Sequence, residues 1–258
     1  MNAFVGMFFA NSAGDFDDKL RLAVYEQGAF YNRIQSLLEL LSNIPDRKKT
    51  FSSGLFPELP SLEGAEELNR LFDHYGSDKG SFHEYSATYA RIFKQLKESP
   101  VILEIGLGTP NPRILSNMGT NAKPGASLKA IGHYLPSARV YGADVDRKIL
   151  FNDSRISTFY IDQLNPKSFE EIARHISTGI DVLIDDGLHS PLANLNTIIG
   201  CLPLMNTLGW LIIEDISEAS IPLWKMLSGL LLPKLESELI LNGKGNLFVI
   251  HFPESLEK

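Results

Sequence analysis

Residues 101–108 read VILEIGLG, a short apolar run that ends in two glycines. An apolar run of this length, stopped by glycine, predicts a buried strand at Val101–Ile105 followed by a tight turn. Similar runs follow at Arg139–Ala143, Ile156–Ile161, Asp181–Ile184 and Trp210–Ile213. Helical patterns separate them, near Gly125–Tyr134, Pro166–Ile176, Leu192–Cys201 and Ile221–Leu235. The alternation predicts an α/β fold in which helices cover both faces of a parallel sheet.

The C-terminal end of the chain has a different pattern. Two β-rich runs, Glu238–Leu241 and Leu247–Phe252, flank the turn-forming residues 242–246, which read NGKGN. Such a spacing indicates a hairpin, so the last strand is expected to run antiparallel. The fold class predicted for the chain is a Rossmann-like, doubly wound, seven-stranded sheet with an antiparallel last strand, preceded by N-terminal helices.

The N-terminal region is predicted to be helical and separate. Phe16–Gln27, after Asp15 as N-cap, and Phe30–Leu41 carry apolar residues at helical spacing. The proline- and glycine-rich stretch Ser42–Gly64 is typical of a linker. We therefore divide the chain into residues 1–64, a helical segment with a linker, and residues 65–258, the main domain. Two amphipathic helices outside that domain suggest a homo-oligomer, and the apolar Met1–Ala10 should pack on its own body or on a second subunit.

Composition excludes several classes of protein. The 258 residues carry 24 basic and 31 acidic side chains, a net charge of −7 that argues against nucleic acid as the main partner. No run reaches the roughly 18 uncharged apolar residues of a membrane span. The single cysteine, Cys201, excludes an internal disulfide framework and a cysteine-based zinc site, so the cytoplasm is the expected compartment.

Polar residues follow the first three strands of the predicted sheet. Ligands of an open α/β sheet bind beyond the carboxyl ends of its strands. Gly106 and Gly108 end the first strand, where they allow close approach to a ligand or simply form a tight turn. The third glycine of a dinucleotide motif is absent, which disfavours a nicotinamide cofactor. Asp144 ends the second strand, where a carboxylate commonly accepts hydrogen bonds from ribose hydroxyls. Asp162 and Gln163 end the third strand.

Four carboxylates end the fourth and fifth strands, as Asp185-Asp186 and Glu214-Asp215. If these strands are neighbours, the acids repel one another unless a cation or proton compensates them. Oxygen ligands of this kind suit Mg²⁺, Mn²⁺ or Ca²⁺. His189, three residues after Asp186, is a candidate general base. Alternatively, the acids only cap the helices that follow.

Together these residues resemble a class I S-adenosylmethionine-dependent methyltransferase, and within that family the metal-dependent macrolide sugar O-methyltransferases of the mycinamicin type. The resemblance covers about Leu68 to Phe252. It rests on Glu104-x-Gly106-x-Gly108, Asp144, YGSDKG at 75–80, His83 and Tyr85, GASL at 125–128, Asp162-Gln163, DDGLH at 185–189, Glu214-Asp215 and the final hairpin. Two positions depart from the usual motifs: Leu188 replaces a small polar residue, which suggests a more apolar acceptor pocket, and Ser77 replaces threonine.

The resemblance also implies site roles. The methyl donor would be held by Glu104, Gly106, Gly108, Asp144, Asp162, Gln163 and Asp185. Magnesium or manganese would be ligated by Asp186, Glu214 and Asp215, with His189 as the base. Lys79 would pair with the carboxylate of the donor, unless it is a solvated turn lysine.

The function implied is metal-assisted O-methylation of a hydroxyl on a sugar or a glycosylated natural product, with S-adenosylmethionine as donor. A second possibility keeps the donor but has a catechol-like phenol or an amine as acceptor. A third is a non-catalytic Rossmann-like binding module. The expected partners are a small-molecule or sugar acceptor and further copies of the chain, with no nucleic acid and no membrane.

Overall fold

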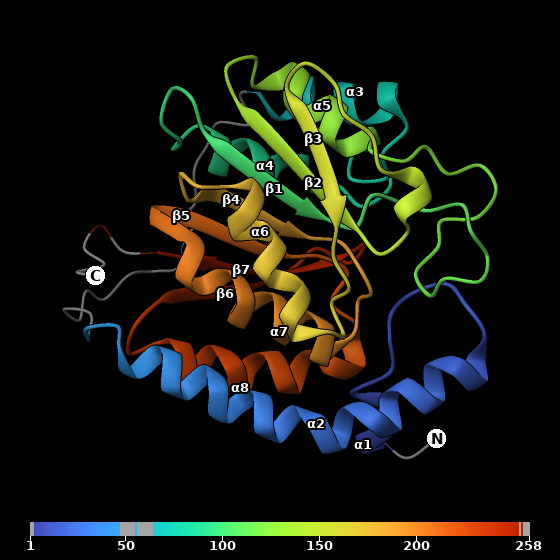
Figure 1. Ribbon diagram of the computed structural model, residues 1–258, viewed down its shortest axis with the longest axis vertical. Helices are drawn as coiled ribbons and strands as arrows, with labels where there is room; N and C mark the ends of the chain where they lie inside the picture. The colour runs from blue at the N-terminus through green and yellow to red at the C-terminus, as the bar shows by residue number, and fades with distance from the viewer. Residues whose placement is uncertain (1–2, 47–54, 56–63, 253, 255–258) are drawn as a thin grey trace.

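The computed structural model describes residues 3–46, 55, 64–252 and 254, and its centre is one seven-stranded sheet (Figure 1). The strand order is β3-β2-β1-β4-β5-β7-β6. Strands β1 to β5 are parallel, and β7 lies antiparallel between β5 and β6. Their bounds are β1 Val101–Ile105, β2 Arg139–Asp144, β3 Ile156–Tyr160, β4 Ile180–Asp185, β5 Met205–Ile213, β6 Glu236–Leu241 and β7 Asn246–His251. The predicted sheet and its antiparallel last strand are confirmed.

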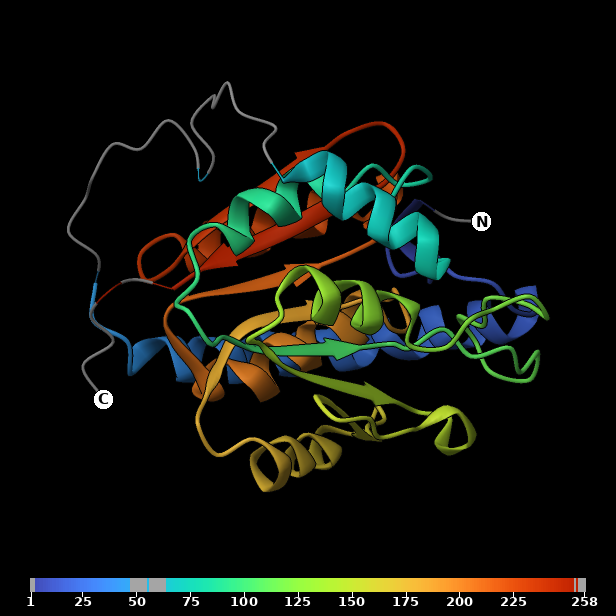
Figure 2. The ribbon, with the colours of Figure 1, turned by 90° about the horizontal axis from the view of Figure 1, so that it is seen from above.

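Helices cover both faces of this sheet, as the alternation predicted. On one face lie α1 Ala3–Gly6, α2 Phe16–Ser42, α6 Glu170–His175, α7 Pro191–Cys201 and α8 Ile221–Leu231. On the other lie α3 Ala65–Tyr75, α4 Ser86–Phe93 and α5 Ala126–Tyr134, the face seen from above in Figure 2. Strand β1 supplies both cores, because Leu103 and Ile105 pack on the first face and Ile102 on the second. Short 3₁₀ turns occupy Arg147–Ile149, Pro166–Phe169, Leu202–Leu204 and Glu218–Ser220.

The N-terminal region forms one long helix, not the two that the pattern predicted. Helix α2 runs unbroken for 27 residues and begins at the expected N-cap, Asp15, which accepts from the backbone of Asp17 at 2.8 Å. Gly28 lies between the two predicted helices and has open space around it, and an interior glycine costs a helix only about 1 kcal/mol. Burial of Phe30 and Leu37 against α7 and the sheet offsets that cost.

The apolar N-terminus packs on the body of its own chain. Phe8 is buried and meets the ring of Phe30 edge-on at 5.2 Å between centroids. The linker expected after α2 falls mostly on residues 47–54 and 56–63, which lie outside the described part of the chain. The division at residue 64 stays a prediction.

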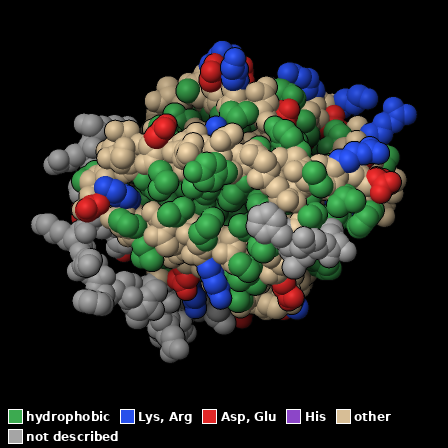
Figure 3. Space-filling view, turned by 90° about the horizontal axis from the view of Figure 1, so that it is seen from below, with side chains coloured by type: hydrophobic (Ala, Val, Ile, Leu, Met, Phe, Trp, Pro, Cys, Tyr) green, Lys and Arg blue, Asp and Glu red, His purple; other side chains and the backbone are tan. Residues whose placement is uncertain are grey.

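The face formed by α2 and α8 carries hydrophobic side chains (Figure 3). On α2 the outer residues Val24, Tyr31 and Leu38 are 58%, 68% and 44% exposed. Self-association therefore stays a prediction, although its premise changes because the inner face of α2 is covered by the chain itself. None of the described helices combines the length and apolar character of a membrane span.

Candidate functional site

A cavity of about 870 Å³ opens at the carboxyl ends of β1, β2 and β4, where the strand order reverses. Of the twelve residues proposed from sequence, eight line it. They are Gly106, Gly108, Asp144, Asp162, Gln163, Asp186, His189 and Asp215. The structure thus brings together residues from five different stretches of the chain.

The glycine turn after β1 is held tightly against the turn after β4. Gly106 has a φ of +97°, and a Cβ there would lie 2.0 Å from the carbonyl oxygen of Asp186. Its N–H donates to the carbonyl of Ala143 at 2.8 Å. The close approach of backbone to backbone requires glycine at this position before any ligand is considered.

Asp144 braces the glycine turn while it faces the cavity. Its carboxylate accepts from the backbone N–H of Leu107 and from that of Asp146, both at 2.7 Å. Burial raises the pKa of Asp144, and these hydrogen bonds oppose the rise. A carboxylate held by two backbone donors is preorganised for a further donor, such as a ribose hydroxyl.

Gln163 fixes the turn that carries the predicted base. Its amide donates to Asp185 at 2.7 Å and to Thr197 at 2.9 Å, and its oxygen accepts from the backbone of Leu188 at 2.8 Å. Its neighbour Asp162 accepts from the backbone N–H of Leu164 at 3.0 Å. These two residues therefore shape the wall of the cavity beyond β3.

The other four proposed residues, Glu104, Asp185, Lys79 and Glu214, are buried and do not line the cavity. Asp185 is bound by Gln163 and, at 3.0 Å, by the Asn194 amide, while burial raises its pKa. Glu104 accepts from the Ser127 hydroxyl at 2.6 Å. The structure therefore places these acids behind the cavity wall, where Asp185 supports Gln163, which faces the cavity.

Lys79 is the internal cation of the acid cluster. Its side chain is 1% exposed, and its ammonium lies 3.2 Å from Glu104 and 2.6 Å from Glu214, and also contacts Asp186. Burial alone would lower the pKa of Lys79, but the three carboxylates raise it well above its usual value. Lys79 is thus not a solvated turn lysine, and in this arrangement its ammonium binds protein carboxylates.

Glu214 is held on its other side by a residue that the sequence analysis did not single out. Tyr89 is fully buried and donates its hydroxyl to Glu214. Burial raises the pKa of Glu214, Lys79 opposes the rise, and Asp186 and Asp215 add to it. The packing of Tyr89 in the core gave no sequence signal of this contact.

A compact group of possible metal ligands faces the cavity. Among the described residues, Asp186, His189 and Asp215 each offer one ligand atom within 4.8 Å of the others. The Nε2 atom of His189 lies 3.6 Å from Asp186 Oδ1 and 3.8 Å from Asp215 Oδ2. The predicted ligand set had Glu214 in place of His189. Lys79 pairs with three carboxylates, those of Glu104, Asp186 and Glu214, and Asp215 adds a fourth to the cluster. This excess of negative charge, together with the oxygen donors, fits a divalent cation.

The structure does not use Asp215 as a helix cap. The helical turn that follows is capped by Ser217, which accepts from the backbone of Ser220 at 3.2 Å. Asp215 instead accepts from the hydroxyl of Tyr85 at 2.7 Å. Both Asp215 and His189 have left-handed backbones, with φ of +55° and +54°. Such conformations are uncommon for residues other than glycine, although Asp and His adopt them more readily than most, and they cluster at functional sites.

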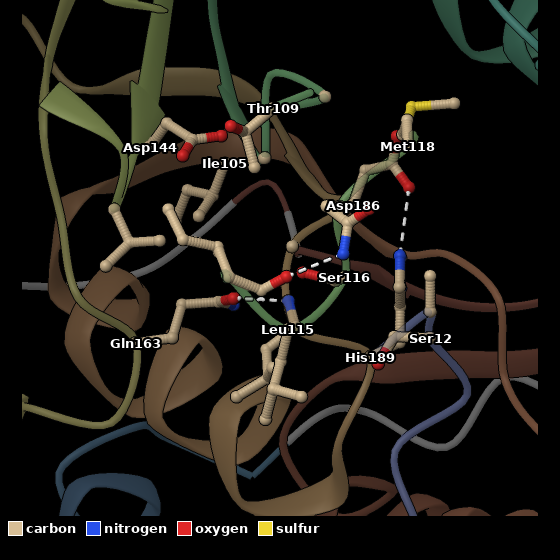
Figure 4. A pocket seen from close by; sticks show the side chains of 18 of the residues that line it. Ser12, Ile105, Thr109, Leu115, Ser116, Met118, Asp144, Gln163, Asp186 and His189 are labelled. Carbon is tan, nitrogen blue, oxygen red and sulfur yellow. Dashed lines mark hydrogen bonds and ion pairs between the residues drawn. The ribbon is translucent and has the colours of Figure 1, made fainter. Parts of the chain in front are cut away.

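Part of the cavity wall comes from segments that the sequence analysis left out. Residues 11–13, before α2, and residues 114–119, in the long loop after β1, both line the cavity, as does Phe82. Figure 4 shows Ser12, Leu115 and Met118 around the same space as Asp144, Asp186 and His189. No motif or periodicity marks these segments, because they are irregular in structure and far from the strand ends in sequence.

Comparison with known proteins gives relatives of one kind, although no known family profile matches the chain. The chain is 30% identical over 166 residues to an 8-demethyl-8-α-L-rhamnosyl tetracenomycin-C 2′-O-methyltransferase of Streptomyces olivaceus. That alignment covers 64% of this chain and 40% of the relative. The chain is 28% identical over 159 residues to the mycinamicin VI 2″-O-methyltransferase of Micromonospora griseorubida, covering 60% and 37%. The chain thus spans about two fifths of the length of these relatives.

A solved structure shows the same fold. The methyltransferase MycE of the mycinamycin pathway, in complex with Mg, S-adenosylhomocysteine and mycinamycin VI, aligns with a TM-score of 0.58 at 18% identity. That alignment spans 100% of this chain and 99% of the other. The resemblance inferred from the sequence motifs is confirmed: the chain is a relative of the sugar O-methyltransferases of tetracenomycin and macrolide biosynthesis and has the fold of class I S-adenosylmethionine-dependent methyltransferases.

Proposed function

We propose that the protein is an S-adenosylmethionine-dependent, divalent-metal-assisted O-methyltransferase that acts on a hydroxyl of a sugar or of a glycosylated natural product. The observation that carries the proposal is the shared cavity. The glycine turn and Asp144 lie in the same space as the cluster of Asp186, His189 and Asp215. A methyl donor and an activated oxygen must meet in one cavity for transfer to occur.

The donor side of the cavity is proposed to be the part lined by Gly106, Gly108, Asp144, Asp162 and Gln163. Asp144 is held by two backbone donors and retains lone pairs for ribose hydroxyls. Glu104 and Asp185 are proposed to act behind this wall, through Ser127 and Gln163, because they are buried away from the cavity. Lys79 acts there in the same way, as the counter-ion of the acids.

The acid cluster is proposed to activate the acceptor. A Mg²⁺ or Mn²⁺ ion held by Asp186 and Asp215, with His189 or Glu214 as a further ligand, would lower the pKa of a sugar hydroxyl. If Glu214 is the ligand, the Nε2 atom of His189, 3.6 Å from Asp186, is placed to take the hydroxyl proton. Tyr85 holds Asp215 in place through its hydroxyl, 2.7 Å away.

The acceptor side is proposed to have an apolar wall. Phe82, Ile114, Leu115, Met118 and Leu188 all line the cavity. Such a wall suits a sugar that is carried on an apolar aglycone, as in the rhamnosyl tetracenomycin named for one relative. The same wall supports a second candidate acceptor, a catechol-like phenol, which would also bind a metal through oxygen.

The proposal extends to the compartment and to the kind of acceptor. The one cysteine, Cys201, is buried and free, which suits a reducing compartment such as the cytoplasm. The net charge of −7 favours a small-molecule acceptor over nucleic acid.

Calorimetry and methyl transfer test the proposal together. S-adenosylhomocysteine should bind the full chain, and titrated Mg²⁺ should bind in its presence. With a rhamnosylated aromatic polyketide as acceptor, methyl transfer should require Mg²⁺ and stop in EDTA. His189→Ala should lower turnover about 10²- to 10⁴-fold, as expected for loss of a general base, with little change in donor binding.

The matched control is His74→Ala, because His74 is exposed at the end of α3, away from the cavity. Methyl transfer that survives both EDTA and His189→Ala would rule out the metal–base mechanism. Transfer to a catechol but not to any glycoside would favour the second acceptor.

A further inference from the structure

Asn11 contacts both turns that carry the cavity-facing acid cluster. Its backbone N–H donates to the carbonyl of His189 at 3.0 Å, and its side-chain amide donates to the carbonyl of Asp215 at 2.9 Å. The second contact joins residues that are 204 positions apart in sequence. Asn11, in the segment that precedes α2, therefore links the turn after β4 to the turn after β5.

The two carbonyls belong to the residues whose backbones are left-handed. His189 and Asp215 have φ of +54° and +55°, and neither is glycine. A residue in this region costs about 1–2 kcal/mol and persists where the surroundings determine its conformation. Each carbonyl receives one hydrogen bond from Asn11, so this residue fixes the two turns relative to each other.

The two residues that follow Asn11 are anchored to other parts of the chain. Ala13 accepts at its carbonyl from the backbone N–H of Ser116, in the cavity loop, at 3.0 Å. Ser12 accepts at its carbonyl from Lys19, on α2, at 2.9 Å. The segment is thus tied to the helix and to the loop opposite the acid cluster, and it can transmit a fixed position to His189 and Asp215.

We propose that Asn11 is a positioning residue of the site. It holds the backbones of His189 and Asp215 so that their side chains, 3.8 Å apart at Nε2 and Oδ2, meet a divalent cation and the acceptor oxygen in register. The inference rests on the proposed function, and it adds to that function a residue from the N-terminal segment.

The test is Mg²⁺ titration by calorimetry on the full chain saturated with S-adenosylhomocysteine. Asn11→Ala removes the amide donor, and Asn11→Asp keeps its shape but puts an acceptor against the Asp215 carbonyl. Both should raise the Kd for Mg²⁺ about three- to tenfold, the effect of one lost hydrogen bond, and lower kcat while the acceptor KM stays within twofold. The Kd for S-adenosylhomocysteine should not change. Asn43→Ala, which removes an amide contact at the far end of α2, is the matched control.

The outcomes separate the two claims. A wild-type chain that binds no Mg²⁺ overturns the proposed function, and the role of Asn11 with it. If the wild type binds Mg²⁺ and both Asn11 variants match it within twofold, the inference alone is wrong. Equal losses of Mg²⁺ and S-adenosylhomocysteine affinity in both variants would show a general structural role and would also overturn it.

Discussion

Glu26 lies fully buried on α2, where it should make the stability of the protein depend on pH. Its carboxylate accepts from the hydroxyl of Ser190 and from the backbone N–H of Leu192 at 3.2 Å, at the start of α7. Burial raises the pKa of Glu26 from 4.5 to about 7, and the two hydrogen bonds only partly oppose the rise. The carboxyl is therefore protonated in the folded protein at a pH where it is ionised in the unfolded chain.

The sign and size of the effect follow from that difference in pKa. Between pH 4.5 and about 7 the folded state binds a proton that the unfolded state has lost, so the free energy of unfolding falls as the pH rises. Above pH 7 both states are ionised and the effect is constant. At about 1.36 kcal/mol per pH unit over this range, ionised Glu26 lowers stability by about 3 kcal/mol at pH 8.

Urea unfolding of the wild type and of Glu26→Gln, at intervals from pH 4.5 to pH 8, measures this term. Glutamine keeps an acceptor for Ser190 but cannot ionise. The stability of Glu26→Gln relative to the wild type should therefore rise by about 3 kcal/mol across the range. Glu39→Gln, an exposed glutamate on the same helix, should show no such rise. A difference between Glu26→Gln and wild type that is the same at every pH would refute the reasoning.

Two further substitutions test residues that hold the site together, one buried behind the cavity and one in its wall. Lys79→Met should lower stability by about 3–5 kcal/mol in urea unfolding, because it leaves buried carboxylates unpaired. Lys244→Met, which breaks an exposed pair with Glu84, should cost less than about 1 kcal/mol, and equal losses would contradict a special role for Lys79. Gly106→Ala should lower stability by more than about 3 kcal/mol in the same assay, because its Cβ would overlap the backbone of Asp186. Gly243→Ala shares the positive φ but meets open space, so it should lose only about 1–2 kcal/mol, and a similar loss at both positions would show that strain alone matters.

The strand ends could be predicted from the sequence because burial leaves a simple pattern. Parallel strands covered on both faces are almost wholly apolar, so polar residues stand out where they end. The first strand, Val101–Ile105, was predicted to the residue. Since β4 and β5 are parallel neighbours, Asp186 and Asp215 had to lie at the same edge of the sheet.

The direction of each acid could not be read from the presence of a pair. Successive side chains in an extended chain point to opposite faces, so two adjacent acids rarely face one cavity. Asp186 and Asp215 face the cavity, whereas Asp185 and Glu214 are buried behind it. The motifs assigned Asp185 to the donor and Asp186, Glu214 and Asp215 to the metal. The alternation of side chains divides the four acids differently, into Asp186 and Asp215, which face the cavity, and Asp185 and Glu214, which need internal partners such as Gln163 and Lys79.

The N-terminal region was the least predictable part because its contacts are long-range. The apolar spacing of α2 predicted a helix but carried no information on what the helix covers. Its buried residues join the same core as β1 and α7, and Glu26 binds Ser190 while Asn11 binds His189. These two contacts reach adjacent residues of one turn, Glu26 from within α2 and Asn11 from the segment before it. The turn that carries the predicted base is therefore held by the N-terminal segment as well as by β4, and a site built only from strand-end motifs omits the contacts of Glu26 and Asn11.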